Sequence, residues 1–352
     1  MSTESKSIRG RGAALNPANR FEPIHLERDA DWNPADDPAP ATQFLRDASA
    51  SIISCNESPD IGYRVSVNPY RGCEHGCIYC YARPTHEYLG FSCGLDFETR
   101  ILVKEKAPEL LRLALASPQW QPDTIAFSGV TDCYQPVERR LRLTRRCLEV
   151  LVEYRNPVCI VTKNHLVTRD LDLLGELARF QAATVLISLT TLDHTLTPKL
   201  EPRTSMPKLR LAAIRALRDA GVPVGVLVSP VLPAITDHEI PRLLGAAAEA
   251  GASFAFYTLL RLPHAVKEIF VDWLERHFPA RKEKVLGRLQ AMRGGKLSNA
   301  EFFSRMTGEG VMAEQIRNLF EVSRNRAGLA SVGPALSNAA FRRPPSAQLT
   351  LL

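Results

Sequence analysis

Three cysteines lie close together in the sequence, in a pattern that can hold a metal centre. Cys73, Cys77 and Cys80 are spaced C-x3-C-x2-C, so three thiolates fall within eight residues. Gly72 and Gly76 lie in the same loop and allow its backbone to wrap closely. Three thiolates leave one iron of a [4Fe–4S] cluster without a protein ligand, and that iron can bind a small molecule. The spacing therefore predicts an iron–sulfur site with one open iron.

A zinc site is the alternative for the same loop, with His75 or His86 as the fourth ligand. Structural zinc usually draws its ligands from two separated pairs of residues. The sequence contains no second pair of this kind. The pattern therefore favours the iron–sulfur cluster over zinc.

The elements that must position this loop alternate along the chain, because short β-rich runs are followed by runs of helical period. Six strands are predicted, at 61–68, 123–128, 158–162, 184–189, 222–229 and 253–259. Five helices are predicted between them, at 107–116, 141–153, 171–180, 207–220 and 238–250. The alternation predicts an α/β fold, a partial (β/α)6 TIM-like barrel with a C-terminal helical extension. An open doubly wound sheet is the alternative.

The same patterns predict four segments. Residues 1–45 are predicted to form an extended or disordered arm, and residues 46–262 the partial barrel. Residues 263–324 are predicted to form the helical extension, and residues 325–352 a flexible tail. Cys147 lies in a predicted helix and Cys159 in a predicted strand, so both are expected in the core.

The composition is that of an ordinary globular protein, with 352 residues, 45% hydrophobic and 23% charged. No apolar stretch is long enough to span a bilayer, and the N-terminus has no apolar signal core. A cytoplasmic protein without membrane contact is therefore expected. The net charge of +6 permits an anionic partner without requiring one.

Polar residues follow the predicted strands. In α/β folds the chemistry lies at the carboxyl ends of the strands, where loops begin. The residues of interest at these ends are Ser128, Thr131, Lys163, Ser188, Arg203, Tyr257 and Arg261. We expect Tyr257 and Arg261, at the end of the sixth strand, to face the substrate.

The cysteine loop resembles that of the radical S-adenosylmethionine (SAM) enzymes. The resemblance rests on the cysteine spacing, on Tyr79 just before the third cysteine and on the position after the first strand. The longer string NPYRGCEHGCIYCYARPTHEYLG is similar to the spore photoproduct lyase-like subgroup, also described as DNA repair photolyase-like. The resemblance covers about residues 60–260.

The resemblance implies an enzyme in which Cys73, Cys77 and Cys80 bind a [4Fe–4S] cluster. It implies that SAM is cleaved to methionine and a 5′-deoxyadenosyl radical, which abstracts hydrogen from the substrate. A low-potential electron donor such as flavodoxin or ferredoxin would supply the electron. The subgroup's lyase has a hydrogen-donor cysteine where this chain has Gly129 or Val130, and Cys133 lies a few residues later.

The resemblance also implies which residues meet SAM: Tyr79, Ser128, Thr131, Lys163, Ser188 and Arg203. The ammonium of Lys163 suits the carboxylate of SAM, and Ser188 resembles a ribose contact. The alternatives are an ordinary turn around Ser128 and Thr131, a solvated Lys163 and a surface ion pair of Arg203. No residue is assigned as catalytic.

DNA is the leading single hypothesis for the substrate, by analogy with the subgroup. RNA, a protein or a small molecule are alternatives that together outweigh it. A non-enzymatic iron–sulfur or zinc protein is the alternative from another class.

Overall fold

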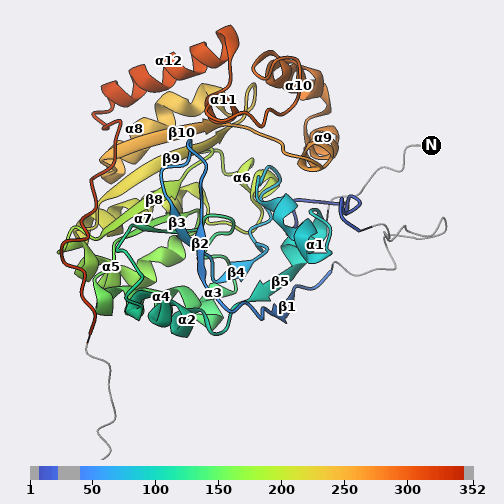
Figure 1. Ribbon diagram of the computed structural model, residues 1–352. Coiled ribbons are helices and arrows are strands. Elements are labelled where there is room, and N and C mark those ends of the chain that lie inside the picture. Colours follow the sequence, from blue (N-terminus) through green and yellow to red (C-terminus); the bar gives the residue numbers. More distant parts are fainter. Residues whose placement is uncertain (1–7, 23–39, 345–352) are drawn as a thin grey trace, which may run out of the picture.

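The computed structural model describes residues 8–22 and 40–344, and its centre is a seven-stranded sheet (Figure 1). Across the sheet the strands follow the order β10 (Phe254–Leu259), β9 (Val224–Val231), β8 (Ala183–Ser188), β7 (Val158–Thr162), β6 (Ile125–Phe127), β3 (Val65–Val67) and β2 (Ile53–Cys55). All neighbouring pairs are parallel except β2 and β3.

The parallel strands are the six that the sequence predicts, and each lies beside its neighbour in chain order. Strands β2 and β10, at the two ends of the sheet, do not pair with each other, so the sheet stays open. The predicted partial barrel is thereby confirmed.

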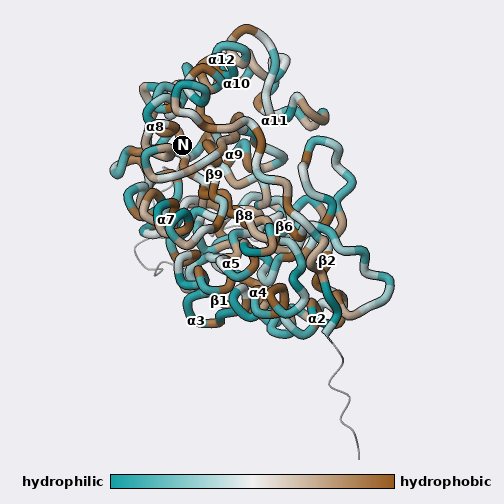
Figure 2. The backbone as a smooth tube through the Cα atoms, turned by 90° about the vertical axis from the view of Figure 1, so that its left-hand side faces the viewer, coloured by the Kyte–Doolittle hydropathy of each residue, from teal (hydrophilic) through white to brown (hydrophobic). Residues whose placement is uncertain are grey.

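Helices cover the outer face of the sheet (Figure 1). The longer ones are α2 (Ala107–Ala116), α4 (Leu143–Tyr154), α5 (Leu171–Ala178), α7 (Pro207–Asp219) and α8 (Ile240–Ala250). The short ones are α1 (Leu95–Thr99), α3 (Glu138–Leu141), α6 (Thr197–Leu200) and the 3-10 helices η1 (Arg83–Leu89), η2 (His165–Asp170) and η3 (Asp237–Glu239). Figure 2 shows hydrophobic strands inside and hydrophilic stretches on the helices, as burial of one helix face requires.

The C-terminal extension packs on the β10 side of the sheet. It comprises α9 (Val266–His277), η4 (Pro279–Arg281), α10 (Lys282–Ala291), α11 (Ser304–Thr307) and α12 (Gly310–Arg326). The buried indole of Trp273 lies against Phe270 and donates its N–H to the carbonyl of Lys199 at 2.8 Å. This contact joins α9 to α6. None of the described helices combines the length and apolarity needed to cross a bilayer.

A small second sheet, in the order β1 (Gln43–Arg46), β5 (Arg100–Val103) and β4 (Tyr70–Arg71), lies beside the cysteine loop. Its strands have two to four residues, too few for a recognisable pattern in the sequence. The predicted segment boundaries remain predictions. Within the described residues, the segment 327–344 is tied to the barrel by the backbone bonds Ser337 N–H to Gln181 O and Arg342 N–H to Tyr154 O, both 2.9 Å.

The two faces of strand β7 differ in burial. Val158, Ile160 and Thr162 are buried, whereas Cys159 and Val161 are partly exposed. The expectation that Cys159 is a core residue was therefore wrong, because alternation turns it to the face that helices do not cover. Cys147 on α4 is fully buried, as expected.

We predict that Gly225→Ala destabilises the sheet. Gly225 on β9 pairs in register with Phe254 on β10, and a Cβ at Gly225 would lie 2.3 Å from the buried Phe254 ring. The ring would have to move, at an expected cost of about 1–3 kcal/mol in the free energy of unfolding.

Urea unfolding measures this cost. Gly245→Ala on helix α8 is the matched control, since a Cβ there meets no atom within 4 Å. The control should be neutral or stabilised by roughly 0.5–1 kcal/mol. Equal stability of Gly225→Ala and the wild type would contradict the packing argument.

Candidate metal centre and cofactor site

The cysteine loop follows β3 and β4 and leads into η1. Gly72 and Gly76 have φ of +80° and +66°, a left-handed conformation that favours glycine. Cys73 and Cys77 are buried and Cys80 is half-buried, and all three are free thiols. The two glycines thus turn the loop so that its cysteines face the protein interior.

The three thiols lie in one electrostatic neighbourhood. Burial, then Glu201, raises the pKa of Cys77 well above its ordinary value, and Cys80 and Cys73 raise it further. Burial and Cys73 likewise raise the pKa of Cys80. Cys77 and Cys80 therefore favour their protonated forms, and a metal centre must displace those protons to bind. Three thiols of one loop fit the donor set of a cluster with one open iron.

Both ring nitrogens of His75 have partners, whereas His86 has a partner for Nε2 only and its buried Nδ1 makes no hydrogen bond within the described part of the chain. Nδ1 of His75 lies 3.3 Å from Asp132, and its Nε2 lies 3.1 Å from Nδ2 of Asn164. Nε2 of His86 lies 2.9 Å from the Arg100 carbonyl, and its ring packs on Phe97. Within residues 8–22 and 40–344, no three His, Cys, Asp or Glu side chains form a site for a single metal ion.

The buried side chain of Arg83 binds the backbone of the cysteine loop. Its fully buried guanidinium donates to the carbonyls of Cys77 at 3.0 Å, Gly76 at 3.3 Å and Gly94 at 2.9 Å. It also pairs with Glu98 at 2.5 Å. These bonds satisfy backbone carbonyls of the loop that burial would otherwise leave unpaired. Arg83 therefore stabilises the conformation of the loop backbone.

Glu98 connects this support to the N-terminal strap, which we define as residues 8–22. The Glu98 carboxylate accepts the backbone N–H groups of Gly12 at 3.0 Å and Ala13 at 2.9 Å. A Cβ on Gly12 would lie 1.9 Å from the Gly76 carbonyl oxygen, so only glycine fits there. The strap thus lies directly against the cysteine loop.

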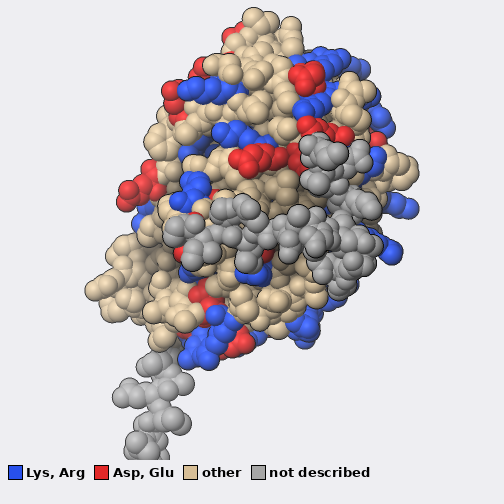
Figure 3. Space-filling view, turned by 90° about the vertical axis from the view of Figure 1, so that its right-hand side faces the viewer, with Lys and Arg blue, Asp and Glu red and all other residues tan. Residues whose placement is uncertain are grey.

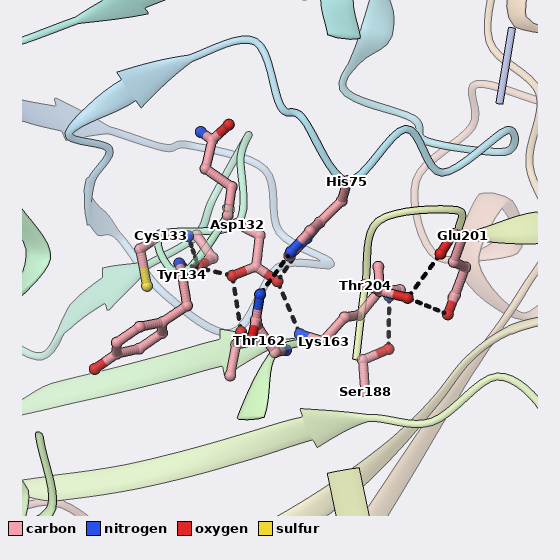
Figure 4. Close-up of polar contacts among 12 residues, drawn as sticks. His75, Asp132, Cys133, Tyr134, Thr162, Lys163, Ser188, Glu201 and Thr204 are labelled. Carbon is pink, nitrogen blue, oxygen red and sulfur yellow. Dashed lines mark hydrogen bonds and ion pairs between the residues drawn. The ribbon is translucent and has the colours of Figure 1, made fainter. Parts of the chain in front are cut away.

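Lys163, Ser188 and Tyr79 come together beside the cysteines. Figure 4 shows the contact of Lys163 with Ser188. Nζ of Lys163 donates to Ser188 Oγ at 2.7 Å and lies 5.8 Å from the centre of the Tyr79 ring. The Tyr79 hydroxyl donates to Glu201, which also accepts from Thr190 at 2.8 Å. Three of the six predicted SAM contacts therefore lie together, and their role toward SAM remains a prediction.

Glu201 is a buried carboxylate held by two cations. Burial alone would raise its pKa, but the Arg210 guanidinium and then the Lys163 ammonium lower the pKa to about 2. The buried Arg210 also donates to the Ser188 carbonyl at 3.0 Å. The pair therefore joins the end of β8 to the loop that follows α6.

Asp132 forms a second polar centre (Figure 4). Its carboxylate accepts the Thr162 hydroxyl and the Lys163 backbone N–H, both at 2.8 Å, and the Tyr134 N–H at 2.9 Å. Burial opposes charge on His75, but Asp132 and the Cys73 thiol outweigh it and raise the pKa of His75 to about 9. Asp132 thus links the ends of β6 and β7 to the cysteine loop.

The other three predicted SAM contacts lie elsewhere. Ser128, with a φ of +78°, accepts the Cys133 N–H at 3.0 Å. Thr131 donates to the Tyr70 carbonyl at 3.2 Å. Arg203 pairs with the buried carboxylate of Glu74 at 3.0 Å on the strap side of the loop. None of the three contacts Lys163 or Ser188.

Tyr257 also departs from expectation. Its ring packs on Phe320 of α12, with centroids 4.6 Å apart, on the helix-covered side of the sheet. The expectation that Tyr257 faces the substrate was therefore wrong, because successive residues of β10 point to opposite faces.

The sequence patterns did not reveal Glu98, Glu201 and Arg210 as parts of the site, and they indicated His75 only as a zinc ligand. Glu201 lies two residues before Arg203, which was predicted instead because a guanidinium suits a carboxylate. Arg210 occurs in the helical pattern of α7, where an arginine indicates a solvated face. The only available signal for Glu201 was its position shortly after the fourth strand.

The radical SAM superfamily model matches residues 67–247, more than half of the chain. The protein therefore belongs to the radical SAM superfamily, whose members use a [4Fe–4S] cluster and SAM. The match contains the three cysteines and all six predicted SAM contacts.

Two relatives extend this family assignment. The uncharacterized protein Rv2578c of Mycobacterium tuberculosis is 41% identical over 219 residues, which are 62% of this chain and 64% of that protein. The chain thus matches less than two thirds of that relative's length. The uncharacterized protein MJ0683 of Methanocaldococcus jannaschii is 28% identical over 218 residues, covering 62% of this chain and 78% of that protein.

Among solved structures, spore photoproduct lyase complexed with dinucleoside spore photoproduct matches with a TM-score of 0.59. The sequences are 15% identical, and the match covers 81% of this chain and 80% of the lyase. At this identity the likeness shows a shared fold.

We predict that Glu98→Gln loosens the strap and the cysteine loop together. The change leaves the buried Arg83 charge uncompensated and turns amide N–H groups toward the donors of Gly12 and Ala13. Breaking one partner of a buried ion pair costs about 3–5 kcal/mol, so urea unfolding should occur at lower denaturant.

Iron bound after anaerobic reconstitution should fall in parallel. Glu149→Gln is the control, because Glu149 is an exposed partner of Arg145 and should matter little. Unchanged stability and iron content in Glu98→Gln would show that the strap is not held through this carboxylate.

We predict that Glu201 makes the protein sensitive to acid. Its pKa is lower in the folded protein than its ordinary value of 4.5, so its contribution is complete above that value. The contribution is lost as the pH falls from 4.5 toward about 2. The full loss is roughly 3 kcal/mol.

Urea unfolding of the metal-free protein at neutral pH and at pH values below 4.5 tests this prediction. Glu201→Gln should be less stable at neutral pH, and the gap to the wild type should narrow in acid. Parallel pH dependence of the two proteins would contradict the prediction.

Proposed function

We propose that the protein is a radical SAM enzyme whose Cys73, Cys77 and Cys80 hold a [4Fe–4S] cluster with one open iron. The observation that carries the proposal is the buried loop itself, with three free thiols spaced C-x3-C-x2-C. When bound, the cluster supplies the electron that cleaves SAM to methionine and a 5′-deoxyadenosyl radical. A low-potential donor such as flavodoxin or ferredoxin would deliver that electron.

The surrounding side chains suit SAM. The Lys163 ammonium lies near Cys77 and Cys80, whose pKa values it lowers, and it can pair with the SAM carboxylate. The Ser188 hydroxyl, 2.7 Å from Lys163, is available to the ribose. Ser128 and Thr131, across the site at the end of β6, are proposed to close its other side.

The protein's part in the chemistry is positioning and exclusion of water. The site lies at the carboxyl ends of parallel strands, and Tyr79, Thr190 and Glu201 around it are buried. Burial keeps stray hydrogen donors away from a reactive radical. The buried Glu201 with Arg210 holds Tyr79 in place beside the cysteines.

We propose that the radical abstracts hydrogen from a nucleic-acid substrate. A solved lyase of the same fold is complexed with a dinucleoside photoproduct, which supports this class. The chain has Gly129 and Val130 where the resemblance places the lyase's donor cysteine, so the proposal does not extend to the lyase reaction.

We predict an electron paramagnetic resonance signal of a reduced [4Fe–4S] cluster after anaerobic reconstitution with iron and sulfide. The signal should change when SAM is added, and 5′-deoxyadenosine should form. Cys77→Ala should lose the signal, since it removes one of the three thiols of the loop.

Cys55→Ala is the control, because Cys55 is exposed on β2 and should leave the signal intact. Lys163→Met should keep the cluster but weaken the response to SAM. Bound zinc, or a cluster indifferent to SAM, would overturn the proposed function and leave a metal-binding protein without this activity.

A further inference from the structure

Arg261 places an unpaired positive charge near the cysteine loop. It follows β10, is half-buried, and its Cζ lies 4.5 Å from the centre of the Tyr81 ring. Among residues 8–22 and 40–344 it has no ion pair or hydrogen-bond partner. Burial lowers its pKa, with a further contribution from Arg305, so the charge is poorly solvated. A guanidinium in this state favours an incoming anion.

Tyr81 lies between the Arg261 charge and the cysteine loop. It follows Cys80 directly, and 45% of its surface is exposed. Its hydroxyl donates to the Gly129 carbonyl at 2.8 Å, which fixes the ring between the cysteine loop and the end of β6. An anionic group bound by Arg261 therefore lies next to the loop that carries the cysteines.

Two aromatic rings are held exposed near Arg261. Phe302 is 51% and Phe303 63% exposed, and Phe303 has a φ of +65°, which is strained for a bulky residue. The Asp60 carboxylate accepts the Phe303 N–H at 3.0 Å and the Arg305 Nε–H at 2.7 Å. The Arg305 Cζ lies 4.8 Å from the Phe302 ring centre. These contacts hold the rings toward solvent rather than into the core.

Arg293 joins the aromatic segment to the end of β10. Its guanidinium donates to the Leu260 carbonyl at 2.9 Å and to the Ser304 carbonyl at 2.8 Å. Arg261 directly follows Leu260, to which Arg293 connects residues 302–305. Arg261 and residues 302–305 lie beyond residues 67–247, so they are not part of the matched family region.

We propose that Tyr81, Arg261, Phe302 and Phe303 form an aromatic–basic rim that binds single-stranded nucleic acid. Arg261 would take a phosphate, and the two phenylalanines would stack on bases, as such rings do in single-strand binding proteins. The inference rests on the proposed function, since it names the substrate class of that site. In Figure 3 Lys, Arg, Asp and Glu are interspersed on the described surface of the face shown, so local contacts rather than a broad field must supply recognition.

The test is fluorescence anisotropy of single-stranded DNA and RNA of the same sequence, about 15 nucleotides long, with the reconstituted protein. The Phe302→Ala, Phe303→Ala double variant should lose about tenfold or more in affinity. The double tyrosine variant should retain binding, because it keeps both rings. Arg261→Gln should lower the dependence of log affinity on log salt by about one unit.

The controls use a similar exposed pair elsewhere, Phe44 on β1 under Arg140, with the Arg140 Cζ 4.9 Å from the ring centre. Phe44→Ala and Arg140→Gln should keep wild-type affinity. Stronger binding of RNA or of DNA identifies which strand the rim accepts. The inference is overturned if neither oligonucleotide binds, if the rim variants bind like the wild type, or if polyglutamate competes equally well.

The cluster signal of the wild-type protein is recorded on the same samples. If the cluster responds to SAM but no oligonucleotide binds, the rim proposal is rejected and the proposed function is retained. If oligonucleotides bind through the rim but no such cluster forms, the proposed function is rejected and the rim proposal is retained.

Discussion

The buried pair of Arg83 and Glu98 is the interaction on which the cysteine loop depends. Arg83 satisfies carbonyls of the cysteine loop, while Glu98 satisfies two backbone amides of the strap. Neither charge is accessible to solvent, so each needs the other. Ile78 and Tyr79 anchor the loop in the main hydrophobic core, and this pair adds polar support to the loop backbone. The strap and the loop therefore gain or lose order together.

The second buried pair, Glu201 with Arg210, has a different consequence because Lys163 shares it. Arg210, Lys163 and Glu201 together carry one net positive charge beside the cysteines. This net positive charge can be neutralised by one anionic group of a bound ligand, and the protein need not supply a second carboxylate for it. The same arrangement keeps Tyr79 from turning away, since its hydroxyl is bound to Glu201.

The sequence predicted the six parallel strands and the cysteine loop because periodicity and residue spacing are local properties. Lys163 and Ser188 were found by the same logic, since both end buried strands. Glu98 could not be found, because its partners are backbone amides 85 and 86 positions away that no pattern marks. The ion pair of Arg203 with Glu74 could not be found either, because it depends on how the loop folds back on itself.

The open sheet has a consequence for how the proposed nucleic-acid substrate would reach the site. Strands β2 and β10 do not pair, but Asp60, between β2 and β3, binds Arg305, beyond β10. The ion pair therefore fastens the two ends of the sheet to each other without closing the barrel wall. A polymer can be laid across such an opening from the side, and no free end has to be threaded through a ring.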